Sequence, residues 1–95
     1  MILFCEYVIP ELHREAFRRW ASEHKELWRT GELLENTAQP GVFVELWRTT
    51  GEDEAAQKQK ERLEGRSEWR NMECWVKGGR EGLRVWTFRP LIPNG

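Results

Sequence analysis

Alternation of apolar and polar residues predicts four strands, at residues 2–9, 32–38, 42–49 and 83–89. The third strand is the strongest, because turn residues precede it in TAQPGVFVELWRT and both of its faces are largely apolar. One face carries Val42, Val44 and Leu46, and the other carries Phe43, Glu45 and Trp47. Since a small antiparallel sheet ordinarily buries one face and leaves the other to water, the second apolar face needs a cover.

A helical period replaces the alternation between these strands. Residues 11–29 place six apolar side chains within about 160° of one another on a helical wheel. They are Leu12, Ala16, Phe17, Trp20, Leu27 and Trp28. A more polar helix begins at the acidic cluster 52–54, and its narrow stripe is Ala56, Gln59 and Leu63. Gly65 interrupts it, and Ser67 caps a shorter helix that carries Trp69, Met72 and Val76 on one face.

The predicted order of elements is therefore β-α-β-β-α-β over a single domain, residues 1–95. Right-handed crossovers place both helices on the same side of the sheet. This order predicts the α+β class with a ferredoxin-like fold: a four-stranded antiparallel sheet with two helices on one face.

The face without helices is predicted to be rich in aromatic residues. Its expected members are Phe4, Glu6, Val8, Phe43, Glu45, Trp47, Arg84, Trp86 and Phe88. An apolar patch of this size exceeds what a soluble monomer usually exposes, so we expect a homodimer whose subunits pair their sheets face to face. Glu6 and Glu45 are expected on adjacent central strands, where they repel each other, and Arg84 is their expected partner.

Composition narrows the choice of partners. The 15 basic and 16 acidic residues give a net charge of −1, which offers no electrostatic reason to expect nucleic acid or an anionic membrane. No apolar run approaches the ~18 residues that span a bilayer. The start, MILFCEYVIPE, lacks the features of a signal peptide. The two cysteines, Cys5 and Cys74, match no metal spacing, so we expect a cytoplasmic protein with reduced thiols.

Few residues are candidates for chemistry. We expect a cavity between sheet and helices with His24 as a general base, Tyr7 as an orienting donor, and Arg62, Trp69 and Thr87 around the ligand. Each has a structural alternative: a half-buried histidine, a core tyrosine, and an arginine stacked on a tryptophan. No metal is expected, because His13 and His24 are 11 residues apart, roughly 16 Å along a helix.

The segment GVFVELWRTTGEDEAAQKQKERLEGRSEWRNM resembles the hallmark of the dimeric α+β barrel superfamily, in its antibiotic-biosynthesis-monooxygenase-like and NIPSNAP-like branches. The shared features are a strand that carries an acid, an acidic helix start, and an arginine and a tryptophan at the helix break. The first strand lacks the asparagine of the haem-degrading branch. The run Arg18-Arg19-Trp20 lacks the histidine of the mutarotase branch.

The resemblance implies a small-molecule site, with cofactor-free oxidation or isomerisation of an apolar or aromatic compound. A second hypothesis is a dimeric binding or structural protein without enzymatic activity. RNA binding through the aromatic sheet face is a third hypothesis, which we favour least because Glu6 and Glu45 would repel phosphates.

Overall fold

The computed structural model describes residues 1–64 and 69–92, and its elements follow the predicted order. In order, the elements are β1 Ile2–Val8, α1 Glu11–Glu23, the 3₁₀ helix η1 Lys25–Trp28, β2 Gly31–Glu35, β3 Val42–Arg48, α2 Glu52–Glu64, α3 Trp69–Glu73, the 3₁₀ helix η2 Gly79–Gly82 and β4 Arg84–Phe88. The predicted interruption at Gly65 and the predicted cap at Ser67 lie outside the described residues.

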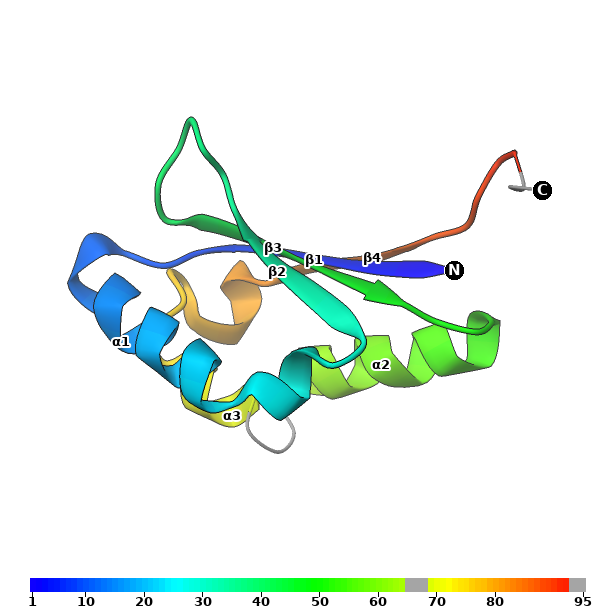
Figure 1. Ribbon diagram of the computed structural model, residues 1–95, viewed down its shortest axis with the longest axis horizontal. Helices are drawn as coiled ribbons and strands as arrows, with labels where there is room; N and C mark the ends of the chain where they lie inside the picture. The colour runs from blue at the N-terminus through cyan, green and yellow to red at the C-terminus, as the bar shows by residue number, and fades with distance from the viewer. Residues whose placement is uncertain (65–68, 93–95) are drawn as a thin grey trace.

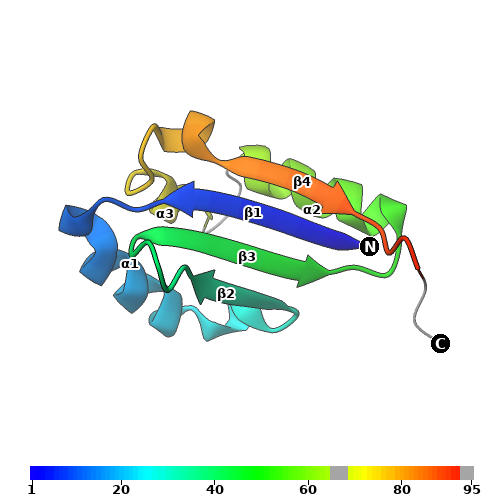
Figure 2. The same ribbon diagram turned by 90° about the horizontal axis from the view of Figure 1, so that it is seen from above.

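The four strands form one antiparallel sheet in the order β2-β3-β1-β4. The described helices all lie on one side of it, as Figure 1 shows, and Figure 2 shows the strands uncovered from the opposite side. The ferredoxin-like α+β prediction is confirmed. None of the helices in the described parts of the chain is long and apolar enough to cross a membrane.

The first predicted helix is too long. It was expected over residues 11–29, but α1 ends at Glu23, because His24 adopts φ −115° and ψ 48° and leaves the α-helical region. The chain then continues as η1, and the Trp28 indole Nε1 donates a hydrogen bond back to the Ala21 carbonyl oxygen, at 3.1 Å. Leu12, which was expected on the apolar stripe, is 86% exposed.

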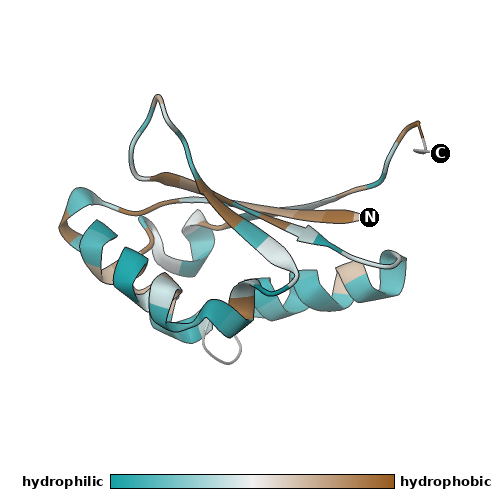
Figure 3. Cartoon of the chain, in the orientation of Figure 1, coloured by the Kyte–Doolittle hydropathy of each residue, from teal (hydrophilic) through white to brown (hydrophobic). Residues whose placement is uncertain are grey.

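The core lies between the sheet and the helices. Antiparallel partners point to the same side, and the pairs Leu3–Trp47, Cys5–Glu45 and Tyr7–Phe43 all point inward. The helix layer supplies large buried side chains, namely Phe17, Trp20, Trp69 and Met72. Figure 3 shows the resulting division, with polar residues along most of the helical surface and apolar residues concentrated on the strands.

The predicted face of β3 is wrong. Phe43, Glu45 and Trp47 were expected on the uncovered face, but all three are buried beneath the helices. Val42, Val44 and Leu46 occupy the outer face instead. Gly31 on β2 leaves the space that the Trp47 ring needs, because a Cβ atom there would lie 2.4 Å from that ring.

The predicted stripe of α2 is displaced by one position. Ala55 and Arg62 are fully buried, whereas Leu63 is 41% exposed and Ala56 faces solvent. Gln59 keeps its inward side, and its Nε2 donates a hydrogen bond to the Val85 carbonyl oxygen at 3.3 Å. The inward face of α2 therefore contains an arginine where the pattern predicted a leucine.

Candidate functional site

A cluster of polar side chains lies at the centre of the core, around the carboxylate of Glu45. Glu45 projects from β3, and its Oε2 accepts hydrogen bonds from the Tyr7 hydroxyl at 2.5 Å and from Arg62 Nη2 at 2.8 Å. Its Oε1 accepts from Arg62 Nε and from the Trp47 indole Nε1, both at 2.9 Å. The two arginine bonds form a bidentate ion pair with no solvent exposure on either side chain.

Arg62 connects α2 to the sheet through this pair. Its guanidinium also lies 4.0 Å from the centroid of the Trp69 ring, so the predicted stacking of these two residues is present. The buried Nη1 atom has no hydrogen-bond partner among the described residues. Since removing either partner would strand a buried charge, the cluster fixes α2 on the sheet.

Three indole rings surround the cluster and fill the space beside it. Trp28 stacks on Trp47 with 5.5 Å between ring centroids, and Trp69 meets both rings edge to face. The Lys58 ammonium lies 4.2 Å from the Trp47 ring centroid and covers it from α2. The predicted site residues Tyr7, Arg62 and Trp69 are therefore close together. They contact Glu45 and one another, and they do not surround a space for a ligand.

The surroundings of this cluster raise the pKa values of Tyr7, Cys5 and Arg62, so these groups keep their protons at neutral pH. Burial, and then the neighbouring Glu45 carboxylate, raise the pKa of Tyr7 well above its usual range. The same two causes raise the pKa of the Cys5 thiol. Burial opposes the charge of Arg62, but the Glu45 carboxylate outweighs it and raises the pKa of the guanidinium. Tyr7 and Cys5 therefore stay protonated at neutral pH, and Tyr7 acts as a hydrogen-bond donor.

The Glu45 carboxylate is a poor candidate for a general base. Both of its oxygens are occupied by two donors each, so no acceptor position is left for a substrate proton. Glu45 was expected on the outer face, so its place at the centre of this cluster was not predicted. The expected stacking of Arg62 on Trp69 could have indicated it. An arginine buried at that position needs an acidic partner, and an acid on the inner face of the sheet can provide it.

His24 lies apart from the Glu45 cluster. It stands at the junction of α1 and η1, with Nδ1 2.9 Å from the Trp20 carbonyl oxygen and its ring 5.4 Å from the Trp20 ring. Tyr7 instead contacts Glu45, Phe17 and Phe43. The structure does not bring His24 and Tyr7 to a common site. His24 is a half-buried histidine hydrogen-bonded to the main chain, which is the structural alternative to a general base.

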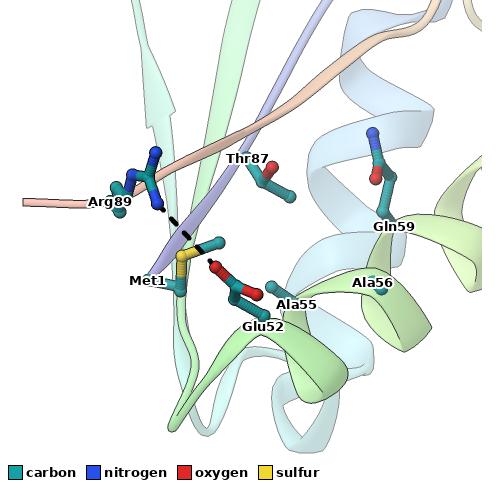
Figure 4. A pocket seen from close by; sticks show the side chains of 7 residues that line it. All are labelled: Met1, Glu52, Ala55, Ala56, Gln59, Thr87 and Arg89. Atoms are coloured by element: carbon teal, nitrogen blue, oxygen red, sulfur yellow. Dashed lines mark ion pairs between the residues drawn. The ribbon is translucent and has the colours of Figure 1, made fainter.

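Thr87 marks a groove between the helix layer and the sheet. Its volume is about 410 Å³, and Figure 4 shows its lining side chains, which come from α2, from β4 and from the residues that flank β1 and β4 at one end of the sheet. They are Met1, Glu52, Ala55, Ala56, Gln59, Thr87 and Arg89. At one end, Arg89 Nη1 lies 4.0 Å from Glu52 Oε1, and both side chains are largely exposed. The groove thus combines an apolar middle with a loosely paired charged end.

A larger groove, of about 550 Å³, lies elsewhere on the molecule. Its lining includes Glu6, Val8, Val42 and Arg84, which belong to the outer face of the sheet. No group of three histidine, cysteine, aspartate or glutamate side chains suited to a metal occurs within residues 1–64 and 69–92.

The uncovered face of the sheet keeps most of its predicted aromatic residues. Phe4 stacks on Trp86 at 5.9 Å and meets Phe88 edge to face at 6.0 Å. Trp86 is 49% exposed and Phe88 is 51% exposed. Arg84 also lies on this face, in register with Glu6, one of its two expected partners, whereas Glu45, the other, lies on the inner face. The outer face also carries the aliphatic residues Ile2, Val8, Leu34, Val42, Val44 and Leu46 and the charged residues Glu32 and Arg48.

Comparison with known proteins supports this fold. No protein-family model matches the sequence, and no curated protein sequence does. Among solved structures, the chain is similar to "Putative antibiotic biosynthesis monooxygenase from Nitrosomonas europaea", with a TM-score of 0.64 and 20% identity. The alignment covers 99% of this chain and 92% of that chain. At this identity the similarity establishes a shared fold, and it confirms at that level the resemblance to the antibiotic-biosynthesis-monooxygenase-like proteins.

Proposed function

We propose that this protein is a homodimer that pairs the outer faces of its sheets and binds a small apolar or aromatic molecule in the groove beside Thr87. The observation that carries the proposal is the outer face itself. Each of the four strands contributes apolar side chains to it, beside the charged residues Glu6, Glu32, Arg48 and Arg84, and none of the described helices covers it.

The energetics of such a pairing are favourable. Trp86, Phe88 and Leu34 are each at least 43% exposed on this face. Hiding ~1,000 Å² of apolar surface at roughly 25 cal/mol per Å² supplies about 25 kcal/mol before the costs of association. Arg84 and Glu6, which are neighbours in register, bring opposite charges to the same surface. A second copy of the chain, which offers the same surface in return, is the partner that this face fits.

The groove beside Thr87 is the better of the two grooves for a ligand. It lies between α2 and β4, whereas the larger groove opens on the face that the proposed dimer would cover. Its volume of about 410 Å³ falls in the range of about 300–1,000 Å³ that is usual for ligand pockets. The small side chains of Ala55 and Ala56 leave this space open along α2.

Cofactor-independent oxygenation of the bound molecule is a second candidate function. The shared fold with a chain described as a putative antibiotic biosynthesis monooxygenase favours it. The saturated Glu45 carboxylate and the packed His24 ring favour binding without catalysis. We therefore place ligand binding first, and we make oxygen consumption in the presence of a bound aromatic compound the test of the second candidate.

Light scattering of the purified chain tests the dimer. The wild type is expected at twice the 11.4 kDa mass of one chain. Trp86→Glu places a charge within the proposed interface and should yield a folded monomer. Leu12→Glu is the matched control, because Leu12 is 86% exposed on α1 and lies away from the sheet face; this variant should remain dimeric. A monomeric wild type, or equal effects of the two variants, would overturn the proposal.

A further inference from the structure

We infer that the groove beside Thr87 selects ligands that carry a carboxylate, and that Arg89 binds this group while Glu52 competes for the same guanidinium. This inference rests on the proposed ligand-binding function and names the chemical class of the ligand. The recognised molecule is an amphipathic acid, with an apolar body in the middle of the groove and its carboxylate at the charged end.

The pair of Arg89 and Glu52 at the charged end is weak enough for a ligand carboxylate to replace Glu52. Arg89 and Glu52 are separated by 4.0 Å, at the limit of an ion pair, and their side chains are 80% and 77% exposed. Exposed pairs of this kind are weak, so little is lost when a ligand carboxylate replaces Glu52. The bidentate pair of Arg62 and Glu45 in the core shows the opposite arrangement, with no exposure and two short bonds.

The remaining lining fits the body of such a ligand. In Figure 4 the side chains of Ala55, Ala56 and Thr87 lie between the charged end and Gln59. The exposed methyl group of Ala56 presents apolar surface, whereas Ala55 is fully buried behind it. The Thr87 hydroxyl adds one donor and acceptor. The Gln59 amide nitrogen is bound to the Val85 carbonyl oxygen, so its Oε1 can accept from a polar group at the far end.

A neutral ligand would leave Arg89 without a partner from the ligand, and a cationic ligand would be repelled by it. Glu52 is the one acid in the lining that could attract a cation, and the Arg89 guanidinium lies 4.0 Å from it. Because the guanidinium presents a planar fork that matches a carboxylate, the acid is the complementary class.

The test compares 4-phenylbutyrate with its neutral analogue 4-phenylbutanamide, using calorimetry and backbone amide shifts on the wild-type protein. The acid should bind more tightly than the amide, with shifts centred on α2 and β4. Arg89→Gln should weaken the acid about fivefold, the scale of one exposed charged contact, and leave the amide unchanged. Glu52→Gln should strengthen the acid by a small factor, because it removes the competitor.

Two further variants separate the site from general charge effects. Arg70→Gln alters an exposed arginine on α3 and should leave both affinities unchanged. Ala56→Leu narrows the groove from an exposed helical position and should weaken both compounds. Equal binding of acid and amide, or weakening of the acid by Glu52→Gln, would overturn the inference while the ligand site stands. Absence of binding by both compounds would overturn the inference and the proposed ligand site together, whereas the dimer is tested independently by light scattering.

Discussion

The two faces of the sheet are both largely apolar, yet they accommodate an acidic residue in opposite ways. On the inner face, Glu45 is fully buried and receives four hydrogen bonds from Tyr7, Trp47 and Arg62. On the outer face, Glu6 lies in register with Arg84 among aromatic side chains that no described helix covers. The difference shows that a charge on a strand does not mark the solvent side, because a helix can supply its counter-charge inside the core.

The largest expected effect comes from breaking the inner pair. Arg62→Met keeps the length of the side chain but leaves the Glu45 carboxylate buried without its counter-ion. This change should cost about 3–5 kcal/mol of unfolding free energy. Urea unfolding followed by tryptophan fluorescence measures it.

The matched control is the exposed pair of Arg18 and Glu35, whose two hydrogen bonds measure 2.9 and 3.0 Å. Arg18→Met should cost no more than about 1 kcal/mol. Equal losses from the two variants would show that burial of the Glu45 pair carries no special weight. The double variant Glu45→Gln with Arg62→Met should lose less than the sum of its single variants, since the stranded charge is gone.

This inner pair also explains which parts of the fold the sequence could predict. The order of strands and helices follows from the periods of the apolar residues, and the structure has that order. The face of β3 does not follow, because Val42, Val44 and Leu46 are as apolar as Phe43 and Trp47. The prediction placed the aliphatic set beneath the helices, which assigned Glu45 to the outer face, and this was wrong.

The same cause displaced the predicted stripe of α2. The spacing of Ala56, Gln59 and Leu63 placed Leu63 inward, whereas the structure buries Arg62 and exposes Leu63. The two errors are linked. Glu45 can be buried only if Arg62 is also buried beside it, and Arg62 can be buried only beside Glu45, so both residues had to be placed inward together. The predicted neighbourhood of Tyr7, Arg62 and Trp69 survived, but the ligand cavity between them is occupied by packed indole rings.

The next largest loss of stability is expected at Gly31, where β2 packs against the Trp47 ring. Gly31→Ala places a methyl group 2.4 Å from the Trp47 ring and should cost about 1–3 kcal/mol through overpacking. Gly51→Ala is the control, because a Cβ atom at Gly51 meets nothing within 4 Å. Thermal unfolding of both variants measures the difference. If Gly31→Ala is as stable as Gly51→Ala, the inward placement of Trp47 is wrong.

A smaller effect is expected from alkaline pH, and it distinguishes the buried groups of the inner face from exposed ones. The pKa values of Cys5 and Tyr7 are raised in the folded protein above their usual values of 9.0 and 10.0. The unfolded chain therefore loses these protons first as pH rises. Stability is intact below about pH 9 and then falls by about 1.4 kcal/mol per pH unit for each group.

Unfolding free energies measured from pH 7 to pH 11 test this dependence. Cys5→Ala and Tyr7→Phe should each reduce the slope, Cys5→Ala from about pH 9 and Tyr7→Phe from about pH 10. Cys74→Ala is the control and should leave the slope nearly unchanged, because this thiol is exposed. A wild-type stability that stays constant up to pH 11 would contradict the burial of both groups.

The central claim is that a second copy of the chain covers the outer face, and the labelling rate of one introduced thiol tests it most directly. Val44→Cys places the thiol on the outer face of β3, opposite Glu6 of β1 and Leu34 of β2. Cys74 is exposed and serves as the internal reference, while Cys5 is buried. At high protein concentration the thiol at position 44 should react far more slowly with iodoacetamide than Cys74, and dilution should accelerate it toward the Cys74 rate. A rate at position 44 that is independent of concentration and close to that of Cys74 would contradict the claim.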